Sequence, residues 1–264
     1  MHPSSMKVKP GRIAPGAFGH TRGTVKRNYA VMPPEGIMDS YLPRWERTVV
    51  RFQAAPQLGA RFAQAVLEIA EGGGTREAFS DELERLIYVL QGSVELTVDG
   101  AASRLDPEGY AFLPPNTKFS VRNVGTGEAR VLGIKKPYES IGLPPPDLII
   151  SKRSDLEKIN HNGTEGRTWE HLLPYGDMRF DMELNILSFA PGTHFPDVET
   201  HIMEHGLYML EGQGMYLLDQ DWHEVWKDDF IWMGPFCPQL FYPTGWETSA
   251  YLLYKDVNRD VSFG

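Results

Sequence analysis

The sequence contains a single cysteine, Cys237, among its 264 residues. One thiol cannot form an intrachain disulfide, and it cannot build the sulfur-rich sites that hold zinc or iron–sulfur clusters. Any metal site must therefore use histidine, carboxylate or amide ligands. The lack of disulfides is typical of a reducing compartment, so we expect a cytoplasmic protein. We expect Cys237 itself to fill a small buried space rather than act as a nucleophile.

Long apolar runs and clusters of basic residues are also missing. No apolar run is long enough to span a bilayer. The first residues include basic side chains, but no apolar segment follows them as it would in a signal peptide. There are 26 lysines and arginines against 35 acidic residues, which gives a net charge of -9. This balance argues against nucleic acid and anionic membranes as partners. A small-molecule ligand is the expected partner.

Helical periodicity is scarce, and only residues 154–160 favour a short helix, with Ser154 or Asp155 as its cap. Instead, glycine and proline separate short segments in which apolar residues alternate with polar ones. This pattern indicates an all-β protein. The clearest strand candidates are residues 93–100, 109–115, 119–124, 229–233 and 249–257.

The chain contains an internal repeat. A shift of 120 positions, without a gap, pairs Gly72 with Gly192, Tyr88 with Tyr208, Leu90 with Leu210, Gly92 with Gly212, Asp99 with Asp219 and Pro115 with Pro235. Two tandem copies of one β unit explain this register better than one large sandwich. The proline-rich stretch 135–150 is typical of an extended connector between them. We therefore predict an arm (1–47), an N-terminal domain (48–136), a linker (137–167) and a C-terminal domain (168–264).

Metal-ligand chemistry is concentrated in one stretch, DVETHIMEHG (197–206). Glu199 and His201 are two residues apart and so lie on one face of a strand, while His205 can join them from the next strand. Gln239, after a Gly-Pro turn, offers a fourth donor. Two imidazoles, a carboxylate and an amide oxygen suit Mn²⁺ or another borderline-hard divalent ion with open positions. The alternative, that these are solvated polar residues on a strand, fits a lone histidine better than this group.

The repeat does not duplicate these residues. At the shift of 120, Glu199 corresponds to Phe79, His201 to Asp81, His205 to Arg85 and Gln239 to Phe119. The sequence therefore predicts that the metal ligands are lost from the N-terminal copy and kept in the C-terminal one.

The motif Gly192, Glu199, His201, His205 and Gly212, followed by Gln239, resembles the paired motifs of the cupin superfamily. A typical cupin has histidine at the positions of Glu199 and Gln239, and glutamate at the position of His205. This altered ligand set, the tandem units and the ending YLLYKDVNRD (251–260) together resemble the (S)-ureidoglycine aminohydrolase family. The resemblance covers most of the chain from about residue 29 onward.

The resemblance implies an all-β bicupin of two tandem jelly-roll (double-stranded β-helix) barrels. It implies a Mn²⁺-dependent hydrolase of purine and allantoin breakdown, which converts (S)-ureidoglycine and water to (S)-ureidoglycolate and ammonia. It also implies a homo-oligomer with one Mn²⁺ per chain. The implied metal ligands are Glu199, His201, His205 and Gln239, and the implied substrate contacts are Glu199, Gln239, Tyr251 and Lys255.

Tyr251 and Lys255 are four residues apart, hence on one face of a strand, where both can enter one cavity. We expect Lys255 or Glu199 to move protons, and the cavity to attract a small anionic substrate. A solvent-facing lysine and a core tyrosine are the alternatives for these two residues. Two other functions stay open: a metal-dependent oxygenase or decarboxylase of a small organic acid, or a cupin that binds a ligand without turnover. Ammonia release, oxygen uptake and ligand binding without turnover distinguish the three.

Overall fold

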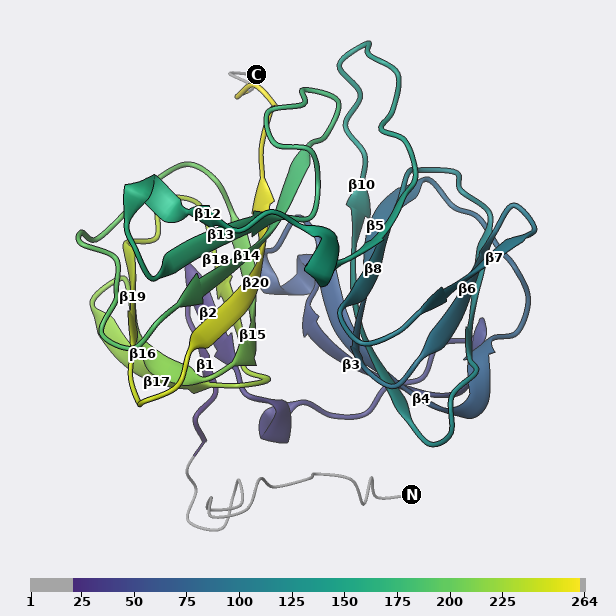
Figure 1. Ribbon diagram of the computed structural model, residues 1–264, viewed down its shortest axis with the longest axis horizontal. Helices are drawn as coiled ribbons and strands as arrows, with labels where there is room; N and C mark the ends of the chain where they lie inside the picture. The colour runs from purple at the N-terminus through teal and green to yellow at the C-terminus, as the bar shows by residue number, and fades with distance from the viewer. Residues whose placement is uncertain (1–20, 262–264) are drawn as a thin grey trace. The chain divides into compact units, whose positions relative to one another are not determined.

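The structure is a computed structural model and describes residues 21–261. Its regular secondary structure is almost entirely β-strand, and it divides into two compact units (Figure 1). We call residues 38–156, 177–181 and 259–261 the N-terminal unit, and residues 21–37, 157–176 and 182–258 the C-terminal unit. The predicted all-β fold with tandem jelly-roll units is confirmed.

The N-terminal unit contains a nine-stranded sheet in which β10 lies between β4 and β5. Its core consists of the inward-facing aliphatic residues of these strands, such as Leu67, Ile87 and Val131. The strands are β3 (Trp45–Ala54), β4 (Ala63–Thr75), β5 (Leu83–Gln91), β6 (Val94–Val98), β7 (Ala101–Leu105), β8 (Gly109–Leu113), β9 (Phe119–Asn123), β10 (Ala129–Pro137) and β11 (Ile149–Lys152).

The C-terminal unit contains two sheets that enclose a more aromatic core, with Phe189, Phe241 and Tyr251 among its members. The eight-stranded sheet comprises β1 (Thr24–Val25), β2 (Tyr29–Met32), β18 (Phe230–Met233), β15 (His205–Glu211), β20 (Ser249–Asp256), β14 (Met182–Phe189), β13 (Arg167–His171) and β12 (Ile159–Asn160). The three-stranded sheet comprises β17 (Asp221–Trp226), β16 (Gln213–Leu218) and β19 (Gln239–Pro243).

The 120-residue repeat of the sequence is also found in the positions of strands and turns. β9 and β19 are offset by the predicted 120 residues at both ends, and the isolated bridge Phe79–Phe119 has its counterpart in Glu199–Gln239. Gly92 and Gly212 both have left-handed backbones, with φ of 74° and 73°. A Cβ at Gly212 would lie 2.3 Å from the Ser249 hydroxyl, so only glycine fits this turn. The predicted tandem duplication is therefore confirmed.

The two units depart from the predicted domain ranges. The described part of the arm is not separate: β2 pairs with β18, and Tyr29 and Val31 are buried in the C-terminal core. Within the predicted linker, β11 pairs with β8 in the N-terminal unit, whereas β12 pairs with β13 in the C-terminal unit. The arm and the linker both contain short strands with apolar side chains. Such strands are not stable alone and gain stability by joining an existing sheet.

The predicted helix at 154–160 is wrong. These residues contain the end of the 3₁₀ turn η3 (Arg153–Asp155) and then β12. Neither Ser154 nor Asp155 caps a helix, since the N-cap position is Lys152 and has no side-chain hydrogen bond. The other short turns are η1 (Pro34–Gly36), η2 (Pro56–Leu58) and η4 (His161–Gly163). No helix among residues 21–261 has the length and apolarity needed to span a bilayer.

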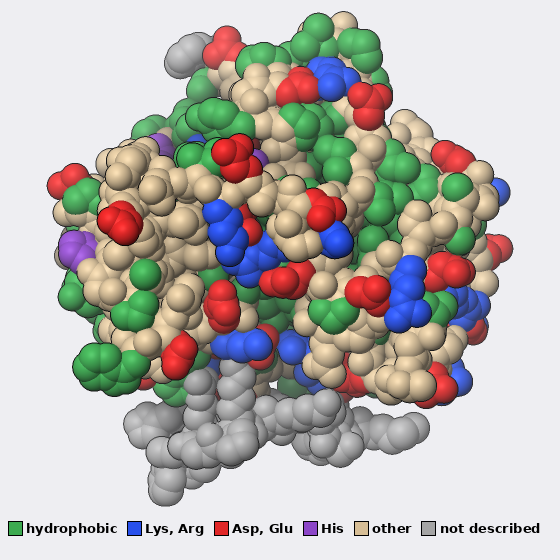
Figure 2. All heavy atoms as spheres, viewed as in Figure 1, with side chains coloured by type: hydrophobic (Ala, Val, Ile, Leu, Met, Phe, Trp, Pro, Cys, Tyr) green, Lys and Arg blue, Asp and Glu red, His purple; other side chains and the backbone are tan. Residues whose placement is uncertain are grey.

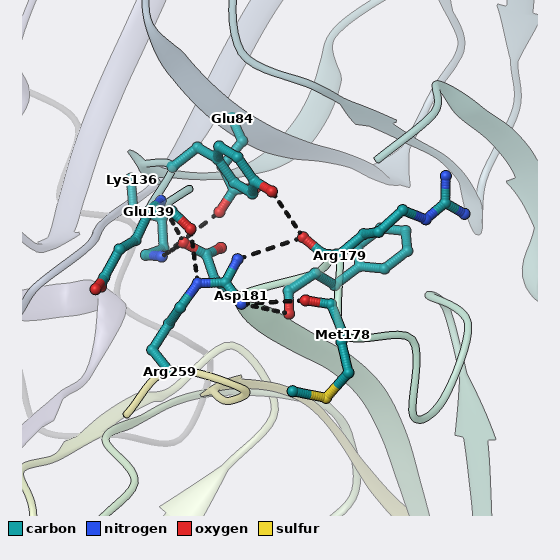
Figure 3. Close-up of polar contacts among 9 residues, drawn as sticks. Glu84, Lys136, Glu139, Met178, Arg179, Asp181 and Arg259 are labelled. Atoms are coloured by element: carbon teal, nitrogen blue, oxygen red, sulfur yellow. Dashed lines mark hydrogen bonds and ion pairs between the residues drawn. The ribbon is translucent and has the colours of Figure 1, made fainter. Parts of the chain in front are cut away.

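Two short segments from late in the chain belong to the N-terminal unit, namely 177–181 and 259–261. Arg259 holds them together, since its guanidinium donates to the backbone carbonyls of Glu139 at 2.6 Å and Met178 at 3.2 Å (Figure 3). Asp181 reaches the unit's interior, where it pairs with Lys136 at 2.5 Å. Long-range polar contacts thus fix these segments, which have no regular secondary structure.

The described surface mixes charges of both signs. Figure 2 shows acidic and basic side chains interspersed over the face in view, in keeping with the balance of 35 acidic and 26 basic residues.

Candidate functional site

A cavity of about 270 Å³ opens within the C-terminal unit. Its walls come from β14, β15, β19 and β20, together with the loop that precedes β15. All six residues predicted as metal or substrate contacts line it: Glu199, His201, His205, Gln239, Tyr251 and Lys255. The structure therefore brings the whole predicted set to one cavity.

His201 and His205 point their ring nitrogens at each other. The two Nε2 atoms are 3.0 Å apart, and the rings meet edge to face. His205 is the first residue of β15 and is buried, whereas His201 belongs to the preceding loop and is half-buried. The predicted strand through Glu199 and His201 is wrong, because only the isolated bridge at Glu199 has strand pairing. The loop, rather than strand alternation, brings the histidines together.

Both imidazoles are held neutral. Burial lowers the pKa of His205 well below its ordinary value, and the nearby His201 and Lys255 lower it further. Burial and Lys255 also lower the pKa of His201. Neutral imidazole is the form that binds a metal ion. Without a cation between them, one of the two facing Nε2 atoms must carry the proton.

Gln239 completes this group from the first position of β19. Its Nε2 lies 3.0 Å from His201 Nε2, and its Oε1 accepts a hydrogen bond of 3.3 Å from the Tyr216 hydroxyl. Tyr216 in turn is hydrogen-bonded to Tyr251. Burial raises the pKa of both tyrosines, so both stay protonated and can donate. In this orientation the amide nitrogen faces His201, and a 180° rotation of the nearly isosteric amide would present the oxygen there.

Glu199 lies beside this group but does not contact it through its side chain. Its backbone forms two 2.9 Å hydrogen bonds with Gln239, and the residue is exposed at the cavity rim. Among residues 21–261, no three histidine, cysteine, aspartate or glutamate side chains have metal-ligand spacing. The two histidines and the glutamine are therefore assembled, and the Glu199 carboxylate is nearby but separate.

The assembled donors fit a divalent cation. Two donors held about 2.1 Å from one ion and at right angles would be about 3.0 Å apart. His201 has this separation from both His205 and Gln239. The three side chains are uncharged and offer lone pairs to a cation.

Lys255 lies in the cavity wall rather than on the surface. Its Nζ is 3.5 Å from Glu183 Oε2, and its side chain is 22% exposed. It is the direct cross-strand neighbour of Glu183 on β14 and of His205 on β15. The ammonium therefore borders both the histidines and the open space of the cavity.

A row of polar residues that the sequence reasoning missed continues from Lys255 across the sheet. Asn185 donates to Glu183 at 3.4 Å and contacts His171 Nδ1 at 2.8 Å through its amide oxygen. The alternation of Glu183 and Asn185 with buried aliphatic residues in MELNILSF (182–189) was the available signal. Tyr216 was missed too, because a single tyrosine in an apolar strand resembles a core residue.

Other residues that carry reactive groups have structural roles here. Cys237 is 3% exposed, and burial raises the pKa of its thiol to about 11. The expectation of a small buried filler is therefore confirmed. His194 is exposed and stacks on Tyr242 outside the cavity lining.

Comparisons with known proteins identify the fold and the relatives of the chain. Residues 65–135 match the family model described as a cupin domain. The chain is 34% identical over 243 residues to the Escherichia coli K12 protein named (S)-ureidoglycine aminohydrolase, covering 91% of this chain and 93% of that protein. It is 35% identical to the Arabidopsis thaliana protein of the same name, covering 92% and 80%. The crystal structure of E. coli protein YlbA superposes with a TM-score of 0.83 at 32% identity, covering 92% of this chain and 97% of that one.

Proposed function

Because this chain belongs to the (S)-ureidoglycine aminohydrolase family of bicupins, we propose that it converts (S)-ureidoglycine and water to (S)-ureidoglycolate and ammonia. We place the reaction in the C-terminal cavity, with one Mn²⁺ per chain held by His201, His205, Gln239 and Glu199. The observation that supports this most is the convergence of the two neutral histidines with Gln239 at 3.0 Å separations.

The reaction exchanges an amine for a hydroxyl at one carbon. The carbon–nitrogen bond breaks, water supplies the new oxygen, and the second proton of that water leaves with the amine as ammonia. A bound divalent ion would supply positive charge to offset negative charge that develops on oxygen. The chain must therefore orient the substrate and move one proton from water to the amine.

Lys255 is suited to hold the substrate. Its ammonium borders the cavity beside the histidines, and the substrate carries a carboxylate, so the two form a charge-assisted pair. Glu183 holds the ammonium from the other side at 3.5 Å and so limits where it can point. Tyr251 and Gln239 provide further contacts from two other strands. Contacts from several directions distinguish the two enantiomers.

Glu199 is suited to move the proton. Its carboxylate lines the cavity, is exposed and makes no hydrogen bond or ion pair among the described residues, so one oxygen could bind the ion while the other accepts a proton from water. Lys255 can then share in the delivery of that proton to the departing amine. The role in purine breakdown, the cytoplasmic location and assembly as a homo-oligomer are further proposals that rest on the family resemblance.

Elemental analysis of the purified chain tests the metal assignment. We expect about one manganese per chain after growth with manganese, and a loss of that metal in His201→Ala. The matched control is Asp81→Ala, which changes the equivalent position of the N-terminal unit and should keep the metal. About two ions per chain, no manganese at all, or equal loss in both variants would contradict the assignment.

A further inference from the structure

The N-terminal unit contains a cavity of its own, of about 110 Å³. It occupies the position in the first repeat that the candidate active site occupies in the second, since Phe79, Asp81, Arg85 and Phe119 line it at the offset of 120 residues. A single water needs only about 10–15 Å³, so this space suits a small organic ligand. Most of the wall is apolar, with Leu67, Ile87, Val121 and Val131 among its members.

Arg85 brings a buried charge to this cavity. Its side chain is 8% exposed, and its Nη2 pairs with Asp81 Oδ1 at 2.5 Å. Its Nη1 is buried and has no hydrogen-bond partner among the described residues. The guanidinium lies 4.6 Å from the ring centre of Phe119 and 5.9 Å from that of Phe79. A buried, unpaired N–H on a charged group is costly, and an anion in the cavity would satisfy it.

Lys135 adds a second cation to the same wall. It is the direct cross-strand neighbour of Arg85 and lines the cavity. Burial lowers the pKa of Lys135, and the neighbouring Arg85 lowers it further, because the two positive charges repel each other. No carboxylate among residues 21–261 forms an ion pair with Lys135.

The charges in the cavity do not balance. Arg85 and Lys135 face a single carboxylate, that of Asp81, which is itself 33% exposed. An excess of positive charge in an apolar, partly closed space attracts one negative group. A metal ion, in contrast, would be repelled by the guanidinium that stands at the position equivalent to His205.

We propose that this cavity is a binding site for a small organic monocarboxylate with a compact apolar substituent. The carboxylate pairs with Arg85 Nη1 and Lys135, and the substituent contacts the aliphatic wall. The site is separate from the C-terminal cavity and does not depend on the reaction proposed there.

Isobutyrate is the probe for this site, and isobutyramide is its neutral counterpart. We expect saturable binding of isobutyrate to the full-length protein in saturation-transfer NMR and calorimetry, with a Kd on the order of millimolar, and at least about tenfold weaker binding of the amide. Arg85→Met keeps much of the side-chain volume and should weaken isobutyrate binding at least about tenfold. Arg104→Met, which changes an exposed arginine of the same unit, should have no effect.

Two further variants keep the test decisive. Lys255→Met removes the equivalent cation of the C-terminal cavity, so isobutyrate binding that persists in this variant and is lost in Arg85→Met belongs to the N-terminal unit. Asp81→Asn keeps the hydrogen bonds that its Oδ1 accepts but removes the competing negative charge, so isobutyrate should bind several-fold more tightly. No binding by wild type, equal binding of acid and amide, loss in Lys255→Met alone, or weaker binding by Asp81→Asn would overturn the proposal.

Discussion

The buried carboxyl of Glu84 keeps its proton in the folded chain, and the resulting loss of unfolding free energy can be measured. Its carboxyl is fully buried on β5 and faces the equally buried Asp181, with Lys136 the shared cation (Figure 3). Lys136 Nζ is 2.5 Å from Asp181 but 3.6 Å from Glu84, and the backbone N–H of Glu139 also donates to Asp181 at 2.8 Å. Asp181 therefore holds the negative charge. Burial and the facing Asp181 raise the pKa of Glu84 to about 10.

The sign of the pH dependence follows from this raised pKa. Below the ordinary value of 4.5, Glu84 is protonated in both the folded and the unfolded chain. Above it, the unfolded chain releases the proton while the folded chain keeps it, so the free energy of unfolding falls by about 1.4 kcal/mol per pH unit. This loss continues until the pH reaches about 10, where Glu84 also ionises in the folded chain.

Glu84→Gln removes the titration and keeps the shape of the protonated acid, including a donor toward Asp181. Between pH 6 and pH 8 the variant should gain about 2.7 kcal/mol of unfolding free energy relative to wild type. At about 2–4 °C per kcal/mol, the difference in Tm between variant and wild type should widen by roughly 5–10 °C. Calorimetry at the two pH values measures this, with the exposed Glu82→Gln as the control. A difference in Tm that is the same at both pH values would refute the reasoning.

Three further predictions concern single residues. Lys255→Met should keep the manganese content and Tm but lower kcat/KM by about 10- to 150-fold, as expected for a lost charge-assisted contact; near-wild-type kinetics would remove Lys255 from the site. Glu183→Gln should lower kcat/KM by a smaller factor, because it frees Lys255 without removing its charge, and a loss larger than that of Lys255→Met would contradict a positioning role. Gly212→Ala should lower the free energy of unfolding by about 1–3 kcal/mol in denaturant titrations, since φ is 73° and the new Cβ meets Ser249, and an unchanged midpoint would argue against this constraint.

Local patterns were sufficient to predict the tandem architecture. Alternating residues mark strands wherever one face is buried, and the gapless offset of 120 residues placed β19 on β9 and Glu199–Gln239 on Phe79–Phe119. The candidate ligands also share one cavity, because the turns that position them recur in both copies.

Contacts between distant segments were not predictable in this way. β2 pairs with β18 about 200 residues later, and no local feature of YAVM (29–32) specifies that partner. Likewise, nothing near Asp181 in the sequence indicates that it meets Lys136 and Glu84. In the loop that carries His201, polar residues alternate with the period of a strand, so the sequence predicts a strand there. The structure of these segments depends on contacts with distant parts of the chain rather than on local secondary-structure propensity.

Ammonia release from freshly generated ureidoglycine tests the central claim most directly. The chain is stripped of metal with a chelator, divided, and assayed with and without added Mn²⁺, and both ammonia and the configuration of the ureidoglycolate are followed. We predict ammonia release well above the spontaneous rate, with (S)-ureidoglycolate as the product, only in the manganese-loaded sample. Release at the spontaneous rate by a chain that has taken up about one manganese would contradict the account.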